Sequence, residues 1–174
     1  MTGTGLPLLF LDVDGPLIPF GAPPPGGYPV HHSPYRTAPA PDASPLLTRV
    51  DPLLGRRLLS LPCELVWATT WLSDANDLLA PWLGLPQLPV VDWPVDDPAV
   101  ADPAVADGVH WKTPTLLARA AGRPFVWVDD EIGPADHRWV TARSPAPVLL
   151  HRVDPQHGLV DADFATLDTW LSTV

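Results

Sequence analysis

The feature that most constrains this chain is an apolar run that ends in two aspartates, Leu8-Leu9-Phe10-Leu11 followed by Asp12-Val13-Asp14-Gly15. Uninterrupted apolar runs of this kind are typical of strands that are buried on both faces of a parallel sheet. Because strand side chains alternate between faces, Asp12 and Asp14 point the same way if the strand continues that far. The carboxyl ends of such strands border the ligand crevice of open α/β sheets. Taken alone, the stretch fits a functional site and an ordinary Asp-capped turn equally well.

Apolar segments with the character of strands alternate with segments of helical spacing along the rest of the chain. Strands are predicted at residues 6–12, 64–68, 88–91, 125–128 and 148–150, and helices at 45–61, 73–82, 113–121, 135–141 and 161–171. Such alternation predicts βαβ units. We therefore expect a three-layer α/β fold, with a central, mainly parallel sheet of about five strands and helices on both faces.

The chain length and the placement of its prolines predict one domain with an irregular segment near its start. A chain of 174 residues is long enough to bury a core and is ordinary for a single domain, here residues 1–174. Residues 16–45 are rich in Pro and Gly and follow neither a strand period nor a helix period. We expect a long loop or a minimal cap there.

Charge and cysteine content limit the partners and the compartment. A net charge of −10 disfavours nucleic-acid backbones and anionic membranes as nonspecific partners, although it leaves room for a local positive site. The single cysteine, Cys63, cannot form an intrachain disulfide, which fits a reducing compartment. The first apolar run lacks a cationic segment before it and contains Asp12, so we expect it to be neither a signal peptide nor a membrane span. We expect a soluble cytoplasmic protein without a membrane partner; the sequence does not fix its oligomeric state.

Polar side chains stand at the carboxyl ends of three predicted strands. They are Asp12 with Asp14, Thr69 with Thr70, and Asp129 with Asp130. Because the ends of parallel strands meet at one edge of a sheet, we expect these side chains to converge. Lys112, the only lysine of the chain, directly precedes a predicted helix and adds a positive charge.

This group of residue types suits phosphoryl transfer. The carboxylates of Asp12, Asp14 and Asp129 are hard oxygen ligands, which favour Mg²⁺ over zinc. One carboxylate can act as a nucleophile and another can move protons. The Thr69 hydroxyl and the Lys112 ammonium can stabilise charge on the phosphoryl oxygens.

At these residues the chain resembles the haloacid dehalogenase superfamily, most of whose members are phosphatases. Four segments, in the family's order, carry the resemblance: Phe10-Leu11-Asp12-Val13-Asp14-Gly15, Val66-Trp67-Ala68-Thr69, Lys112 ahead of a helix, and Trp127-Val128-Asp129-Asp130. Together they span about residues 6 to 151. The resemblance implies a Rossmann-like core and an aspartyl-phosphate mechanism.

The resemblance also implies roles for individual residues. Asp12 is expected to attack phosphorus, and Asp14 to protonate the leaving oxygen and then to accept a proton from water. Thr69 and Lys112 are expected to hold the phosphoryl group. Asp12, the backbone carbonyl of Asp14, and Asp129 are expected to bind Mg²⁺, with Asp130 either a further ligand or a residue behind the ligands.

Some positions depart from the family pattern or leave a choice open. Pro16 follows Gly15 where the family often has Thr or Ser, and the doubled Thr69-Thr70 makes Thr70 an alternative to the preferred Thr69. A minimal cap implies an open site for a phosphorylated substrate that is bulky, or for a phosphate at a nucleic-acid end. The closest resemblance is to small bacterial members, some of them related to phosphatase modules of RNA-repair proteins.

Two other functions compete with a Mg²⁺-dependent phosphatase. Dehalogenation at carbon needs the nucleophile but not an acid at the second position, so Asp14 counts against it. A catalytically idle module that binds Mg²⁺ or a phosphorylated partner is the alternative from another class. The substrate itself is not readable, because residues 16–45 and 92–110, where specificity is expected, have no regular pattern.

Overall fold

A four-stranded parallel sheet forms the centre of the protein. The computed structural model describes residues 5–35, 45–94 and 108–174. The strands are β1 (Leu8–Leu11), β2 (Glu64–Trp67), β3 (Phe125–Asp129) and β4 (Val148–Arg152). They pair in the order β2-β1-β3-β4 and every pairing is parallel. The uninterrupted apolar runs of β1 and β3 therefore occupy the two central positions, where both faces are buried.

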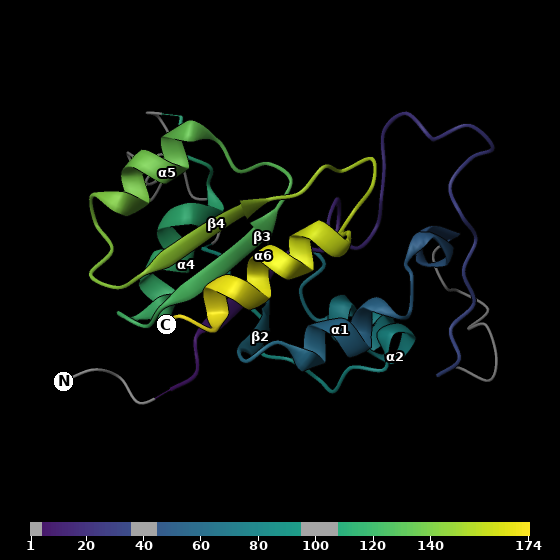
Figure 1. Cartoon of the computed structure of the whole chain (residues 1–174), viewed down its shortest axis with the longest axis horizontal. Helices are drawn as coiled ribbons and strands as arrows, with labels where there is room; N and C mark the ends of the chain where they lie inside the picture. Colours follow the sequence, from purple (N-terminus) through teal and green to yellow (C-terminus); the bar gives the residue numbers. More distant parts are fainter. Residues whose placement is uncertain (1–4, 36–44, 95–107) are drawn as a thin grey trace.

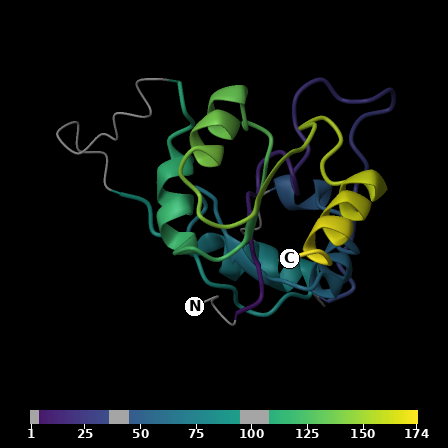
Figure 2. The ribbon, with the colours of Figure 1, turned by 60° about the vertical axis from the view of Figure 1, so that its left-hand side comes forward.

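Helices cover both faces of this sheet, as Figures 1 and 2 show. The α-helices are α1 (Leu54–Ser60), α2 (Ala80–Leu83), α4 (Lys112–Ala120), α5 (Pro134–Thr141) and α6 (Asp161–Leu171). Side chains of α1, α2 and α6 pack in one core cluster with Leu9 and Leu11 of β1, while those of α4 and α5 pack in another with Leu8 and Phe10. The alternation of strand side chains thus separates two apolar layers. The three-layer Rossmann-like α/β arrangement expected from the sequence is confirmed.

The prediction of about five strands is wrong by one strand. Residues 88–91 make a single isolated bridge, between Val90 and Trp67, and no continuous ladder. The side chain of Asn76 explains this, because its amide donates to the Leu88 carbonyl and accepts from the Leu88 N–H. Pro89 has no N–H to offer. Leu88 therefore satisfies its backbone groups through a side chain, and the backbone hydrogen bonds between this segment and β2 are those made with Trp67.

Two predicted helices differ from the expected regular α-helix, and a proline divides one of them. The segment predicted as one helix at 45–61 consists of a 3₁₀ helix, η1 (Pro45–Arg49), and α1. Pro52 separates them, because proline lacks an N–H and disfavours helical backbone in the residue before it. The segment predicted at 73–82 begins with a π-helical turn, η2 (Ala75–Leu79), and continues as α2. Gly84 ends it in the left-handed conformation.

The Pro/Gly-rich segment contains turns and bends between residues 19 and 35, without a helix or strand in that described stretch. Residues 36–44, the remainder of the predicted loop or minimal cap up to residue 45, lie outside the described residues, as do residues 95–107. The single domain over 1–174 and the minimal cap stay predictions. Within the described ranges, the helices are too short to cross a membrane.

Gly55 marks a close crossing of α1 over the end of α2. A Cβ atom at Gly55 would lie 1.8 Å from the backbone oxygen of Leu83. Because a backbone oxygen cannot rotate away, Gly55→Ala must push the two helices apart. We expect the free energy of unfolding to fall by about 3 kcal/mol, measured by urea denaturation.

A second glycine provides the matched control for this prediction. Gly133 has an extended backbone, and a Cβ there would meet its nearest atom at 3.6 Å, an ordinary contact. Gly133→Ala is therefore expected to cost less than about 1 kcal/mol. Equal losses in the two variants would contradict the steric explanation.

Cys63 lies directly before β2, and its thiol is partly buried. Burial raises the pKa of its thiol to about 12. A raised acid pKa means that the thiolate, the nucleophilic form, is scarce at pH 8. We expect iodoacetamide to alkylate Cys63 at least ~100-fold more slowly in the native protein than in urea at pH 8. Mass spectrometry over time measures both rates, and equal rates would contradict the prediction.

Candidate active site

Asp12 and Asp129 lie opposite each other at the carboxyl end of the two central strands. The register pairs Leu11 of β1 with Val128 of β3, and the N–H of Asp12 donates to the Val128 carbonyl over 3.0 Å. The next residue on each strand is therefore an aspartate. Both are buried, with 6% of Asp12 and 0% of Asp129 exposed. Strand alternation puts both on the sheet face that α4 and α5 cover.

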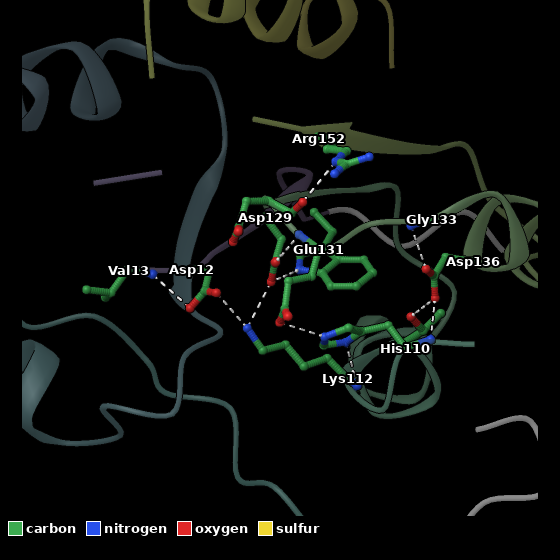
Figure 3. A network of polar contacts seen from close by, with 12 residues as sticks. Asp12, Val13, His110, Lys112, Asp129, Glu131, Gly133, Asp136 and Arg152 are labelled. Atoms are coloured by element: carbon green, nitrogen blue, oxygen red, sulfur yellow. Dashed lines mark hydrogen bonds and ion pairs between the residues drawn. The ribbon is translucent and has the colours of Figure 1, made fainter. Parts of the chain in front are cut away.

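Lys112 reaches between these two carboxylates from α4. It is the first residue of that helix, whereas the sequence had placed it directly before the helix. Its Nζ donates to Asp12 Oδ2 and to Asp129 Oδ2, each over 2.8 Å, and only 2% of the residue is exposed. Figure 3 shows the ammonium group pointing into the gap between the two aspartates.

The carboxylates outnumber the positive charge that neutralises them. Burial, opposed by Lys112 and reinforced by Asp129, raises the pKa of Asp12 to about 7. Burial, and to a smaller extent repulsion from Asp129, raises the pKa of Asp130 to about 6. For Lys112, burial alone would lower the pKa, but attraction to Asp12 and Asp129 raises it. Crowded carboxylates of this kind are stabilised by a further cation.

Three of these side chains can meet at one ion. Ligand oxygens of Asp12, Asp129 and Asp130 all lie within 4.8 Å of one another. Gly15 makes room for this group, because a Cβ there would lie 2.6 Å from Asp130 Oδ1. A group of carboxylate oxygens, with Asp12 and Asp129 buried and Asp130 partly buried, fits a hard divalent cation such as Mg²⁺. Among the described residues, this group does not include the side chain of Asp14. Its absence is compatible with the expectation that the backbone carbonyl of Asp14 is the metal ligand.

The end of β2 brings one of the two candidate threonines into the interior. Thr69 is fully buried, whereas Thr70 is exposed. The Thr69 hydroxyl oxygen accepts from the backbone N–H of Trp71 over 3.2 Å, and the Thr69 carbonyl accepts from the indole of Trp93 over 2.9 Å. The phosphate-binding role of Thr69, with Thr70 as the alternative, stays a prediction. Asp14 is half-buried and its Oδ2 accepts from the indole N–H of Trp71 over 3.0 Å.

Asp136 ties the segment before α4 to the loop after β3. Its Oδ1 accepts from the backbone N–H of His110 and from the Thr113 hydroxyl, and its Oδ2 accepts from the backbone N–H of Gly133 (Figure 3). Asp136 is 1% exposed, and both of its carboxylate oxygens accept hydrogen bonds. A buried, satisfied group of this kind holds its neighbours in one arrangement. Asp136 thereby fixes the start of the helix that carries Lys112.

Sequence reasoning missed two indole donors. Trp127 Nε1 donates to Asp129 Oδ2 over 3.1 Å, and Trp93 holds the Thr69 carbonyl. Strand alternation could have revealed the first, because Trp127 precedes Asp129 by two residues and shares its face. The second contact joins a loop to the end of a strand, and no local sequence pattern predicts it.

Comparison with known proteins identifies a family for this chain. A family model described as the HAD domain in Swiss Army Knife RNA repair proteins matches residues 8–164. Searches of curated proteins and of solved structures found no match. The matched range includes β1 to β4 and all the predicted site residues, and family membership supports a hydrolase of the haloacid dehalogenase type. The chain therefore belongs to the family of HAD domains in Swiss Army Knife RNA repair proteins.

Proposed function

We propose that this protein is a Mg²⁺-dependent phosphatase that hydrolyses phosphoric monoesters through an aspartyl-phosphate on Asp12. The observation that carries the proposal is the buried pair of Asp12 and Asp129 with the Lys112 ammonium between them. A purely structural core gains little from such a group, because desolvating these charges costs as much as their attraction returns. A phosphoryl site needs this combination of a nucleophile, a cation and metal ligands.

Each residue has a definite part in the proposed reaction. An oxygen of the Asp12 carboxylate attacks phosphorus, and the bond from phosphorus to the leaving oxygen breaks. Asp14 gives its proton to that oxygen, and then takes a proton from the water that attacks the aspartyl-phosphate. Lys112 and the Thr69 hydroxyl donate to the phosphoryl oxygens while charge develops there. The products are an alcohol and inorganic phosphate, and Asp12 is regenerated.

The residues present fit a magnesium ion. Asp12, Asp129 and the backbone carbonyl of Asp14 would hold it, with Asp130 as the additional carboxylate. A bound Mg²⁺ would offset the negative charge of the carboxylates and the phosphate, so that the two anions can approach. Burial of Asp12 and Asp129 supports this assignment, since unpaired charges are costly in the interior.

Two measurements test the proposal. The first is hydrolysis of p-nitrophenyl phosphate, which we expect to require Mg²⁺ and to stop when a chelator is added. The second is the melting temperature with beryllium fluoride, an analogue of the phosphoryl group on Asp12. We expect it to raise the melting temperature only when Mg²⁺ is present. Absence of both effects in the folded protein would refute the proposal.

The same pair of measurements separates the phosphatase from an idle binding module. Mg²⁺-dependent stabilisation by beryllium fluoride without turnover of any phosphate ester would favour a module that binds a phosphorylated partner. Release of halide from a haloacid, without phosphate release, would favour the dehalogenase. The presence of Asp14 supports the phosphatase over the dehalogenase, because carbon dehalogenation leaves an acid at that position without a role.

We infer further that the substrate carries its phosphate on a bulky group, with a nucleic-acid end as the favoured case. The family's description names RNA repair proteins, which supports an RNA substrate, whereas the net charge of −10 opposes tight backbone binding. The two considerations are compatible if the enzyme grips only the terminal phosphate. Short RNAs with a 5′- or 3′-phosphate should then be better substrates than sugar phosphates of equal concentration. Preference for a sugar phosphate would refute this substrate class.

A further inference from the structure

We propose that Trp71 is a positioning residue for proton transfer, holding the Asp14 carboxyl group in place for its part in the reaction. The inference deepens the proposed phosphatase function and rests on it. Trp71 stands two residues after Thr69, in the segment that joins β2 to η2. It contacts both the predicted proton carrier and the predicted phosphate-binding hydroxyl.

Two hydrogen bonds from one residue link the ends of β1 and β2. The indole Nε1–H of Trp71 donates to Asp14 Oδ2 over 3.0 Å, across 57 positions of sequence. The backbone N–H of the same residue donates to the Thr69 hydroxyl oxygen over 3.2 Å. Asp14 and Thr69 are therefore fixed relative to each other through a single rigid ring and its own backbone.

The Trp71 side chain also packs against the core. Trp71 is partly buried and packs against the core cluster that includes Leu9, Leu11 and the helices α1, α2 and α6. The residue after it, Leu72, has a φ of 50°, a left-handed backbone that non-glycine residues rarely adopt. Strain of this kind persists only where the surrounding contacts determine the conformation. The surrounding contacts thus keep Leu72 in a backbone conformation that leucine disfavours.

Each contact has a consequence for the chemistry. The indole occupies Oδ2 of Asp14, which leaves Oδ1 to give its proton to the leaving oxygen and later to take one from water. The backbone N–H of Trp71 fills an acceptor position on the Thr69 hydroxyl, which directs the hydroxyl proton elsewhere, toward a phosphoryl oxygen. Trp71 touches neither the phosphorus nor the leaving group in this scheme. It acts through Asp14 and Thr69.

The test compares leaving groups that differ in their need for a proton. An alkoxide leaves only when it is protonated, whereas p-nitrophenolate leaves without help. We expect Trp71→Phe to lower kcat/KM for an alkyl phosphate about tenfold more than for p-nitrophenyl phosphate. With p-nitrophenyl phosphate, kcat and KM should fall together, because hydrolysis of the aspartyl-phosphate also needs Asp14 and becomes slow. A burst of p-nitrophenol should then precede the steady state.

Two comparisons separate positioning from a general structural role. Trp82→Phe is the matched control, because its indole N–H donates to the Val50 carbonyl over 2.9 Å, away from the site. It should leave the ratio of kcat/KM values for the two substrates unchanged. The second comparison is the pair Asp14→Asn and Asp14→Asn with Trp71→Phe. If Trp71 acts on leaving-group protonation through Asp14, adding Trp71→Phe should not change the ratio further.

Three results would overturn the inference. They are equal losses of kcat/KM for both substrates in Trp71→Phe, a further change of the ratio in the Asp14→Asn background, and full activity toward the alkyl phosphate. Should Trp71→Phe fail to fold, benzothienylalanine at position 71 keeps the shape of indole and removes only its N–H. Wild-type protein without Mg²⁺-dependent turnover would refute the phosphatase itself, a result distinct from these three.

Discussion

Asp12→Asn is expected to lower the turnover of p-nitrophenyl phosphate at least ~10³-fold, while the protein stays folded. The amide has nearly the shape of the carboxylate but cannot form the acyl phosphate, so the covalent route is closed. Replacing one of the crowded carboxylates also removes repulsion against Asp129, which favours a folded variant. Steady-state assays with Mg²⁺ in excess measure the loss, and circular dichroism measures the fold.

A matched variant makes this result specific to the nucleophile. Asp161 has a side chain that is 95% exposed and lies at the start of α6. Asp161→Asn changes the same functional group and should leave turnover unchanged. Beryllium fluoride should no longer stabilise Asp12→Asn, because the analogue bonds to the carboxylate. Normal turnover by folded Asp12→Asn would remove Asp12 from the reaction.

Lys112→Met is expected to have the largest effect on stability. The ammonium is 2% exposed and satisfies both Asp12 and Asp129 over 2.8 Å. Removing it leaves two buried carboxylates facing each other, and breaking a buried pair costs about 3–5 kcal/mol. Urea denaturation in the absence of metal should show this loss. Turnover should also fall by about 10²-fold or more, because a donor to the phosphoryl oxygens is gone.

Magnesium provides an internal check on the electrostatic explanation. The variant site carries one positive charge fewer, so it should bind Mg²⁺ more tightly and be stabilised by it more than the wild type. Arg57→Met is the matched control, because Arg57 pairs with Asp161 at the surface over 2.7 Å. Exposed pairs contribute about 1 kcal/mol or less. Equal losses in the two variants would contradict a special role for the buried lysine.

Much of the sheet could be predicted from local patterns. The runs that became β1 and β3 are apolar at every position before the aspartate, which only a strand buried on both faces requires. The segment at 88–91 has a similar apolar character, but the side chain of Asn76 occupies the Leu88 backbone groups. A competing side chain twelve residues away is invisible to a window that reads only the segment itself.

The candidate site likewise has one part that local patterns predict and another that they do not. Alternation along β1 and β3 determines which face Asp12 and Asp129 occupy, so their convergence follows once the strands are neighbours. The contacts that hold them depend on strand order and helix placement. Lys112 meets Asp12 across 100 positions of sequence, and Trp71 meets Asp14 across 57. Local periodicity does not encode such long-range partners.

By itself, the sequence determined that an apolar strand ends in Asp12-Val13-Asp14 and that threonine, lysine and aspartate follow in the order of a phosphoryl-transfer site. Those facts are local, because each depends on residue type and on the alternation of neighbours. Only the tertiary structure decided that Thr69 is buried and Thr70 exposed, and that the Lys112 ammonium lies between Asp12 and Asp129. Burial and pairing are set by what the other elements bring alongside, and so they appear only when the chain is folded.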